Sequence, residues 1–126
     1  FTGASNEIQG TLLEGNGGFG VVDLGSGQRM EAAMLQPLSP GEKVRVALRP
    51  ESIALGRQDG ANTYRARVLD RRYQGTQTVY DIDFLGRRLE ALELGTAARH
   101  EPGADTSVVM PREVCWVYRD ERQVTP

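Results

Sequence analysis

Few side chains in this sequence are of the types that carry out catalysis or hold metal ions. The chain has a single histidine, His100, and a single cysteine, Cys115. A structural zinc site usually takes four such ligands, and a hydrolytic triad needs a histidine that an acid positions. His100 stands in a polar stretch that ends at Pro102–Gly103, which favours an exposed loop residue. We therefore expect neither a zinc site nor a triad.

Cys115 lies in the run Val114–Tyr118, whose residue types are typical of a buried strand. A nucleophilic cysteine needs an electropositive, partly exposed setting and a base. A lone cysteine also forms no intramolecular disulfide, which is compatible with a reducing compartment. We expect Cys115 and Trp116 to be largely buried in the last core strand of the second half of the chain.

The carboxylates and the glycine-rich segment indicate structure and not catalysis. Asp81 and Asp83 alternate on one side of an expected strand, and Glu90 and Glu93 follow further on, whereas a glycosidase needs two acids that flank a cleft. Gly15–Gly20 lacks the lysine and hydroxyl of a phosphate-binding loop, and it favours a hairpin turn. We expect no enzymatic activity, no bound ATP and no cofactor for this chain.

The composition indicates one ordinary globular domain. The chain has 126 residues, 39% apolar residues and a net charge of −2, and the acidic balance argues against binding to a phosphate backbone. Aromatic residues make up only 6%, too few for a base-stacking groove. No apolar run approaches the roughly 20 residues of a membrane-spanning helix. We expect no nucleic-acid partner and no direct membrane insertion. The start, Phe1–Gly3, lacks an initiator methionine and a signal pattern, which favours a piece of a longer chain.

The elements that position these residues are short alternating strands, and they occur in two similar halves. Pro40–Glu51 aligns with Pro102–Glu113, and Val22–Ala32 aligns with Tyr80–Ala91. Each half predicts a strand, a glycine turn, a strand, a Pro-Gly turn, a strand and then a junction that contains proline and glutamate. The alternative is a chance similarity of loop composition.

Two such halves predict one small all-β unit. We place the first sub-barrel at residues 1–55, a polar linker at 56–63 and the second sub-barrel at 64–126. A unit of about 60 residues is marginal by itself, so the halves should pack together. Closing a sheet into a barrel would also remove exposed strand edges.

The stretch V-R-V-A-L-R-P-E-S-I-A-L at Val44–Leu55 is the most specific motif. Pro50 lacks an N–H and favours an extended Arg49, so strand pairing should stop there with Arg49 and Glu51 at the strand end. The stretch resembles the "V-x-V-x-(I/L)-R-P-E-x-(I/L)-x-L" signature of the C-terminal TOBE/MOP-like, OB-related regulatory domain of bacterial ABC importer ATPases.

A second motif lies at the start of the chain. The segment F-T-G-A-S-N-E-I-Q-G-T-L resembles the opening of the same importer domain, with Asn6 and Gly10 at matching positions. It also resembles the "S-A-R-N" start of molybdate-binding MOP domains, but Gly3 stands where that motif has serine and Ser5 where it has arginine. The missing hydroxyl at Gly3 counts against molybdate or tungstate binding. From the residues alone, Asn6 is a turn-capping amide and Gly10 marks a close backbone approach.

The resemblance implies an all-β, OB-fold/MOP-like barrel with a regulatory role. Tyr73–Ile82 resembles a stretch of polyamine and ferric iron importer subunits, so polyamine transport is the implied subtype. The implied partners are a second copy of the domain, the ATPase domain of the parent chain and membrane permease subunits. The implied location is cytoplasmic, peripheral at the inner membrane.

Two questions stay open at this point. Arg49, Pro50 and Glu51 lie at or near the dimer contact in one interpretation, and in the other Arg49 and Glu51 form an internal ion pair that fixes the turn. The alternative function is a small-ligand or oxyanion-binding MOP-like module.

Overall fold

The computed structural model describes residues 6–16, 18–58, 60, 62–95 and 100–120. Within them the chain forms ten strands and two 3-10 helices, all of them short or medium in length. In chain order they are β1 (Asn6–Asn16), β2 (Phe19–Gly25), β3 (Gln28–Met34), β4 (Lys43–Leu48), η1 (Pro50–Ser52), β5 (Ala54–Leu55), β6 (Thr63–Tyr73), β7 (Gln77–Phe84), β8 (Arg87–Leu94), β9 (Asp105–Val109), η2 (Arg112–Val114) and β10 (Trp116–Arg119).

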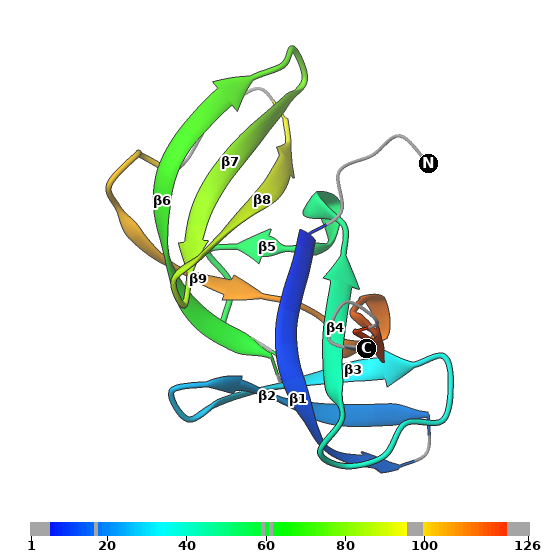
Figure 1. Cartoon of the computed structure of the whole chain (residues 1–126). Helices are drawn as coiled ribbons and strands as arrows, with labels where there is room; N and C mark the ends of the chain where they lie inside the picture. Colours follow the sequence, from blue (N-terminus) through cyan, green and yellow to red (C-terminus); the bar gives the residue numbers. More distant parts are fainter. Residues whose placement is uncertain (1–5, 17, 59, 61, 96–99, 121–126) are drawn as a thin grey trace.

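The strands form two five-stranded units that lie one above the other in Figure 1. The first is a closed barrel with the order β1-β2-β3-β10-β4, and the second is a sheet with the order β5-β9-β6-β7-β8. The expected all-β, OB-fold-like architecture of two related halves is confirmed. No helix in the described part of the chain has the length and apolar character needed to cross a membrane.

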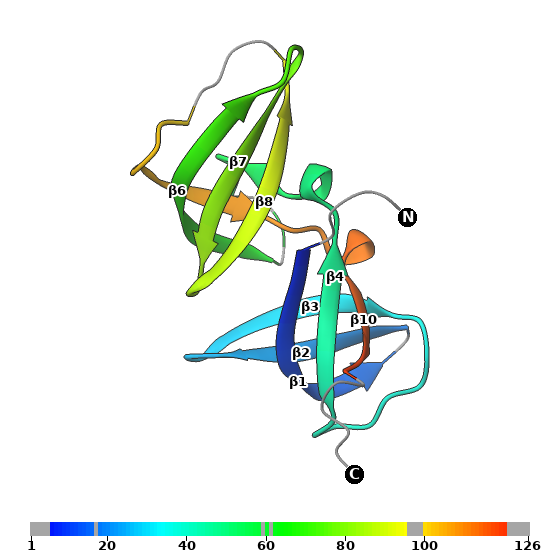
Figure 2. The same cartoon turned by 45° about the horizontal axis from the view of Figure 1, so that its top comes forward.

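Each half gives its last strand to the other unit. After β4 the chain passes through η1, and β5 pairs with β9 of the second sheet. After β9 it passes through η2, and β10 pairs with β4 and β3 of the first barrel, beside β4 in Figure 2. We call these two passages the crossovers.

The sheets therefore do not follow the division expected at residues 55 and 64. Residues 54–55 belong to the second sheet, and residues 116–119 complete the first barrel. The physical reason lies in the strand edges. The first four strands of each half leave an edge with unpaired backbone groups, and the strand that follows the crossover supplies hydrogen bonds to the edge of the opposite half.

The repeat is visible in small details of both halves. β1 and β6 each shift register just after the equivalent residues Leu12 and Val68. In the Pro-Gly turns, Gly41 N donates to Leu12 O and Gly103 N donates to Val68 O, both at 2.7 Å. Both turn glycines have positive φ, 92° at Gly41 and 90° at Gly103, which only glycine adopts without strain. Shared bulges and shared turns argue against a chance similarity.

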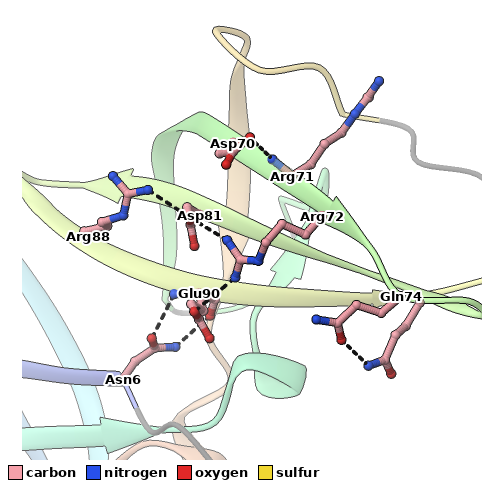
Figure 3. Close-up of polar contacts among 9 residues, drawn as sticks. Asn6, Asp70, Arg71, Arg72, Gln74, Asp81, Arg88 and Glu90 are labelled. Carbon is pink, nitrogen blue, oxygen red and sulfur yellow. Dashed lines mark hydrogen bonds and ion pairs between the residues drawn. The ribbon is translucent and has the colours of Figure 1, made fainter.

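Two asparagine side chains join the halves. Asn6 Nδ2 donates to Glu90 O at 2.8 Å, and Glu90 N donates to Asn6 Oδ1 at 2.9 Å (Figure 3). The opposite half has the same arrangement, because Asn62 exchanges two hydrogen bonds with the backbone of Glu31. We call these contacts the asparagine clasps. Side chains from both halves also form one continuous hydrophobic cluster.

Candidate functional site

The first crossover contains the Arg-Pro-Glu motif. Arg49 is extended, with φ −85° and ψ 153°, and Pro50 opens η1, as expected for a residue before proline. The turn is held by backbone hydrogen bonds, from Ser52 N to Arg49 O at 2.9 Å and from Ile53 N to Pro50 O at 3.3 Å. Arg49 and Glu51 are exposed. Glu51 makes no ion pair within the described part of the chain, so the internal Arg49–Glu51 pair does not form there.

A hollow of about 420 Å³ lies between the two crossovers. Arg49 and Ser52 come from the first crossover, and Val114 comes from the second. The complete lining is Ala47, Leu48, Arg49, Ser52, Val114 and Trp116. The structure thus brings the motif residue Arg49 to the same hollow as Trp116, a proximity that the sequence did not predict.

The expectation that Trp116 is buried is wrong, because 41% of this residue is exposed. Its neighbour Val117 is fully buried, and successive strand residues point to opposite faces, so Trp116 points out of the barrel. The apolar run around it carries no sign of which residues face inward. Which residues of β10 face the core is decided by the pairing of β10 with β3 and β4. This pairing joins residues that lie far apart in the sequence.

Trp116 is the largest member of an apolar row across the outside of the first barrel. In register, Ala47 of β4 lies opposite Trp116, Trp116 lies opposite Ala33 of β3, and Ala33 lies opposite Phe19 of β2. Within this row Trp116 is 41% exposed, whereas only 8% of Ala33 is exposed. We call Ala47, Trp116, Ala33 and Phe19 the tryptophan row.

Arginines border the tryptophan row. The Arg112 guanidinium lies 4.2 Å from the centre of the Phe19 ring, and its Nη1 is 3.0 Å from Glu31 Oε1. Two residues further along β10, the Arg45 guanidinium lies 4.7 Å from the Tyr118 ring. An apolar centre with a polar, arginine-containing rim is the usual anatomy of a protein–protein contact.

Cys115, which precedes Trp116, is fully buried as expected. Burial raises the pKa of the Cys115 thiol to about 12, and Sγ lies 3.4 Å from Pro111 O. The thiolate, which is the reactive form, is therefore scarce near neutral pH. Cys115 directly precedes β10, its backbone O accepts from Ala33 N of β3 at 2.7 Å, and its side chain belongs to the hydrophobic cluster that both halves share.

The opening motif has a structural part in the described residues. The amide of Asn6 forms one of the asparagine clasps instead of capping a local turn. At Gly10 a Cβ atom would lie 2.5 Å from Val22 Cγ1 and 2.7 Å from Asp23 O, so β1 approaches β2 too closely for any side chain. Gly3 lies outside the described residues.

His100 is not the exposed loop residue that its surroundings in the sequence indicated. Only 16% of its side chain is exposed, with Nε2 3.7 Å from Glu93 Oε2. Its ring meets the buried Tyr80 ring edge-on, at 5.5 Å between centroids. Among the described residues no three His, Cys, Asp or Glu side chains gather as metal ligands. The arrangement at the crossovers suits contact with another surface better than a chemical reaction.

Comparisons with known proteins agree with this architecture. Residues 46–117, more than half of the chain, match the family model described as the TOBE domain. One similar solved structure is described as the cytoplasmic molybdate-binding protein ModG, in a crystal form with molybdate bound. It superposes with a TM-score of 0.75 over 95% of this chain and 99% of that chain, at 18% identity, which establishes likeness of fold. A search of curated protein sequences finds no match.

Proposed function

The chain belongs to the TOBE domain family, and from that premise we propose that it is the regulatory, dimerising C-terminal domain of the ATP-binding subunit of an ABC importer. The Arg49-Pro50-Glu51 signature supports the importer context, and Tyr73–Ile82 supports a polyamine type. In this proposal the domain has no enzymatic activity of its own. It works at the cytoplasmic face of the inner membrane, next to its own ATPase domain and the permease subunits.

The observation that carries the proposal is the tryptophan row beside the hollow at the crossovers. Trp116 is 41% exposed and is itself one wall of the 420 Å³ hollow, so the same face offers both a large ring and a hollow to a second copy. A two-fold axis brings identical patches together, so each Trp116 would enter the hollow of the other copy. Buried tryptophans at such centres often dominate the binding energy.

The proposed mechanism is mechanical. Two copies stay associated through the tryptophan rows while the ATPase domains of the parent chains open and close. Arg49 lines the hollow and would lie inside the contact, whereas the exposed Glu51 would lie at its edge. Edge charges change association modestly, so we assign the main contribution to Trp116.

Replacement of Trp116 tests the proposal. We expect Trp116→Ser to weaken dimerisation about 30-fold or more, the effect of losing an interface residue worth roughly 2 kcal/mol. The measurement is the dimer dissociation constant from sedimentation velocity over a concentration series. The matched control is Tyr73→Ser, because Tyr73 is an aromatic residue on the second sheet with 62% exposed.

The control should dimerise like the wild type. Equal weakening by both substitutions would point to a general loss of apolar surface. A wild-type domain that remains monomeric at high concentration would refute dimerisation through this surface. Circular dichroism spectra of both variants establish that they are folded.

A second candidate function is small-ligand or oxyanion binding. The similar solved structure described as molybdate-bound ModG supports it. Because a ligand that binds the native state stabilises it, molybdate should raise the melting temperature of the wild-type domain if this candidate is right. Glycine in place of the motif serine at position 3 argues for a site elsewhere in the chain.

A further inference from the structure

Two arginines occupy neighbouring outward positions on β6, and only one of them faces acidic residues. Arg67 is paired in register with Asp83 of β7 and with Asp105 of β9. Its Nε lies 3.2 Å from Asp105 Oδ1. Opposite charges in register across strands stabilise a sheet, so the charge of Arg67 is balanced within the fold.

Among the described residues, no acidic side chain balances the charge of Arg65 in this way. Its partner in register on β9 is Ser107, and Arg65 Nη1 donates to Ser107 Oγ at 3.1 Å. Within the described residues no carboxylate forms an ion pair with Arg65. The in-register pairs of opposite charge therefore include Arg67 but not Arg65, and the Arg65 guanidinium keeps N–H donors that no carboxylate among the described residues accepts.

The hydroxyl of Ser107 is a further hydrogen-bond donor beside Arg65. Its Oγ also accepts a hydrogen bond from Gln58 Nε2 at 3.1 Å. A hydroxyl has two acceptor positions and one proton, so with both acceptor positions in use Ser107 has only its O–H left to offer. Only 5% of Ser107 is exposed, and the two hydrogen bonds that its Oγ accepts limit the direction in which the O–H can point.

A cavity of about 370 Å³ opens beside Arg65, between the linker and two hairpin ends. It is lined by Gln28, Gln58, Thr63, Tyr64, Arg65, Leu85 and Ser107. None of these seven residues is acidic. Leu85 adopts a positive φ of 52° and Gly86 one of 83°, because both belong to the two-residue hairpin turn between β7 and β8, and this turn places Leu85 at the cavity.

We propose that the Arg65 cavity binds a small organic acid, with its carboxylate on Arg65 and Ser107 and its carbon chain against Leu85. The carboxylate supplies the negative charge that Asp83 and Asp105 supply beside Arg67. Guanidinium and carboxylate match in geometry, and the cavity has room for several carbon atoms in addition. This inference rests on the second candidate function, ligand binding, and names its site and ligand class.

The test compares the two arginines with one ligand. Wild type, Arg65→Gln and Arg67→Gln are titrated with succinate by isothermal calorimetry at constant ionic strength, and succinamide is the uncharged control ligand. We expect Arg65→Gln to weaken succinate binding about tenfold or more, as for loss of a charge-assisted hydrogen bond. Arg67→Gln should stay within about twofold of wild type, and succinamide should not bind.

The remaining outcomes separate the site from the function. Equal weakening by both substitutions would mean general charge attraction and would overturn the proposal. If molybdate raises the melting temperature of wild type and Arg65→Gln alike while succinate does not bind, ligand binding stands and this site is wrong. If neither molybdate nor succinate binds, both the site and the second candidate function are rejected.

Discussion

Asn62 connects three backbone groups from two distant parts of the chain. Its Oδ1 accepts from Glu31 N at 2.9 Å, and its Nδ2 donates to Glu31 O at 2.7 Å and to Met110 O at 2.8 Å. Only 2% of Asn62 is exposed. Water therefore cannot replace the side chain amide, and each backbone group would be left buried without a partner.

Removal of this amide should be costly. We expect Asn62→Ala to lower the free energy of unfolding by about 3 kcal/mol, because buried donors and acceptors lose their partners. Urea denaturation measures the change, with Asn16→Ala as control, since Asn16 is exposed at the end of β1. A loss below about 1 kcal/mol would show that the clasp contributes little to stability.

Asp81 is a nearly buried carboxylate between two arginines. Its Oδ2 lies 2.8 Å from both Arg72 Nη1 and Arg88 Nη2 (Figure 3), and 8% of its side chain is exposed. Burial alone would raise the pKa of Asp81, but the hydrogen bonds and charges of Arg72 and Arg88 outweigh it and hold the pKa below the ordinary value. The ionised form is thus favoured by folding.

A lowered pKa makes this contribution depend on pH in a definite direction. The stabilisation is complete above the ordinary carboxyl pKa and is lost as the pH falls through the lower pKa of the folded state. We expect Asp81→Asn to lower the free energy of unfolding by about 2 kcal/mol near neutral pH, with the difference from wild type shrinking below about pH 4. Urea denaturation at several pH values measures it.

The control for this series is Asp105→Asn. Asp105 forms an ion pair with Arg67, but 57% of its side chain is exposed, and exposed pairs contribute little. A difference between Asp81→Asn and wild type that persists unchanged at low pH would contradict the assigned role of the charge.

At the level of the elements, local patterns predicted the strands but not all of their partners. The alternation in Val44–Leu48 and Tyr64–Val68 sets which residues face inward, and the structure buries Val44, Val46, Tyr64 and Val68 among them. The short strands after the crossovers have no such alternation. Trp116 was misplaced for this reason, because only its long-range pairing decides the face on which it stands.

The two crossovers also end differently. β10 has four residues and closes the first barrel through parallel pairing with β3. β5 has only two residues and pairs with β9 alone. Gly56, with φ 78°, turns the chain into the linker immediately afterwards. The equal lengths of the repeat motifs gave no indication of this asymmetry.

For the whole molecule, the repeat predicted an all-β architecture, and the crossovers make each sheet contain a strand from the other half. The two related halves, the Pro-Gly turns and the strand-rich character of the described residues followed from the sequence. The exchange of strands did not, because a duplicated pattern is equally compatible with two separate barrels and with two intertwined ones. The cavity beside Arg65 was also missed, since its residues come from segments far apart in the chain.

Cutting the linker tests the intertwined arrangement. We expect fragments 1–58 and 59–126 to be unfolded separately, because the first lacks β10 and the second lacks β5. Equimolar mixing should restore the spectrum of the intact domain, as observed by circular dichroism and by amide chemical-shift dispersion. A well-dispersed spectrum of fragment 1–58 alone would show that four strands suffice for the first barrel.

The exchange of strands at the crossovers has a consequence for the origin of the domain. Even without the linker at residues 56–63, each repeat would depend on a strand from the other. A gene that encoded a single repeat would therefore have produced an obligate dimer of two swapped chains. Duplication and fusion of that gene would have joined two subunits that were already interlocked. The present single-chain fold is then a tethered ancient dimer, and its two halves were free to diverge, one keeping a closed barrel and the other a five-stranded sheet.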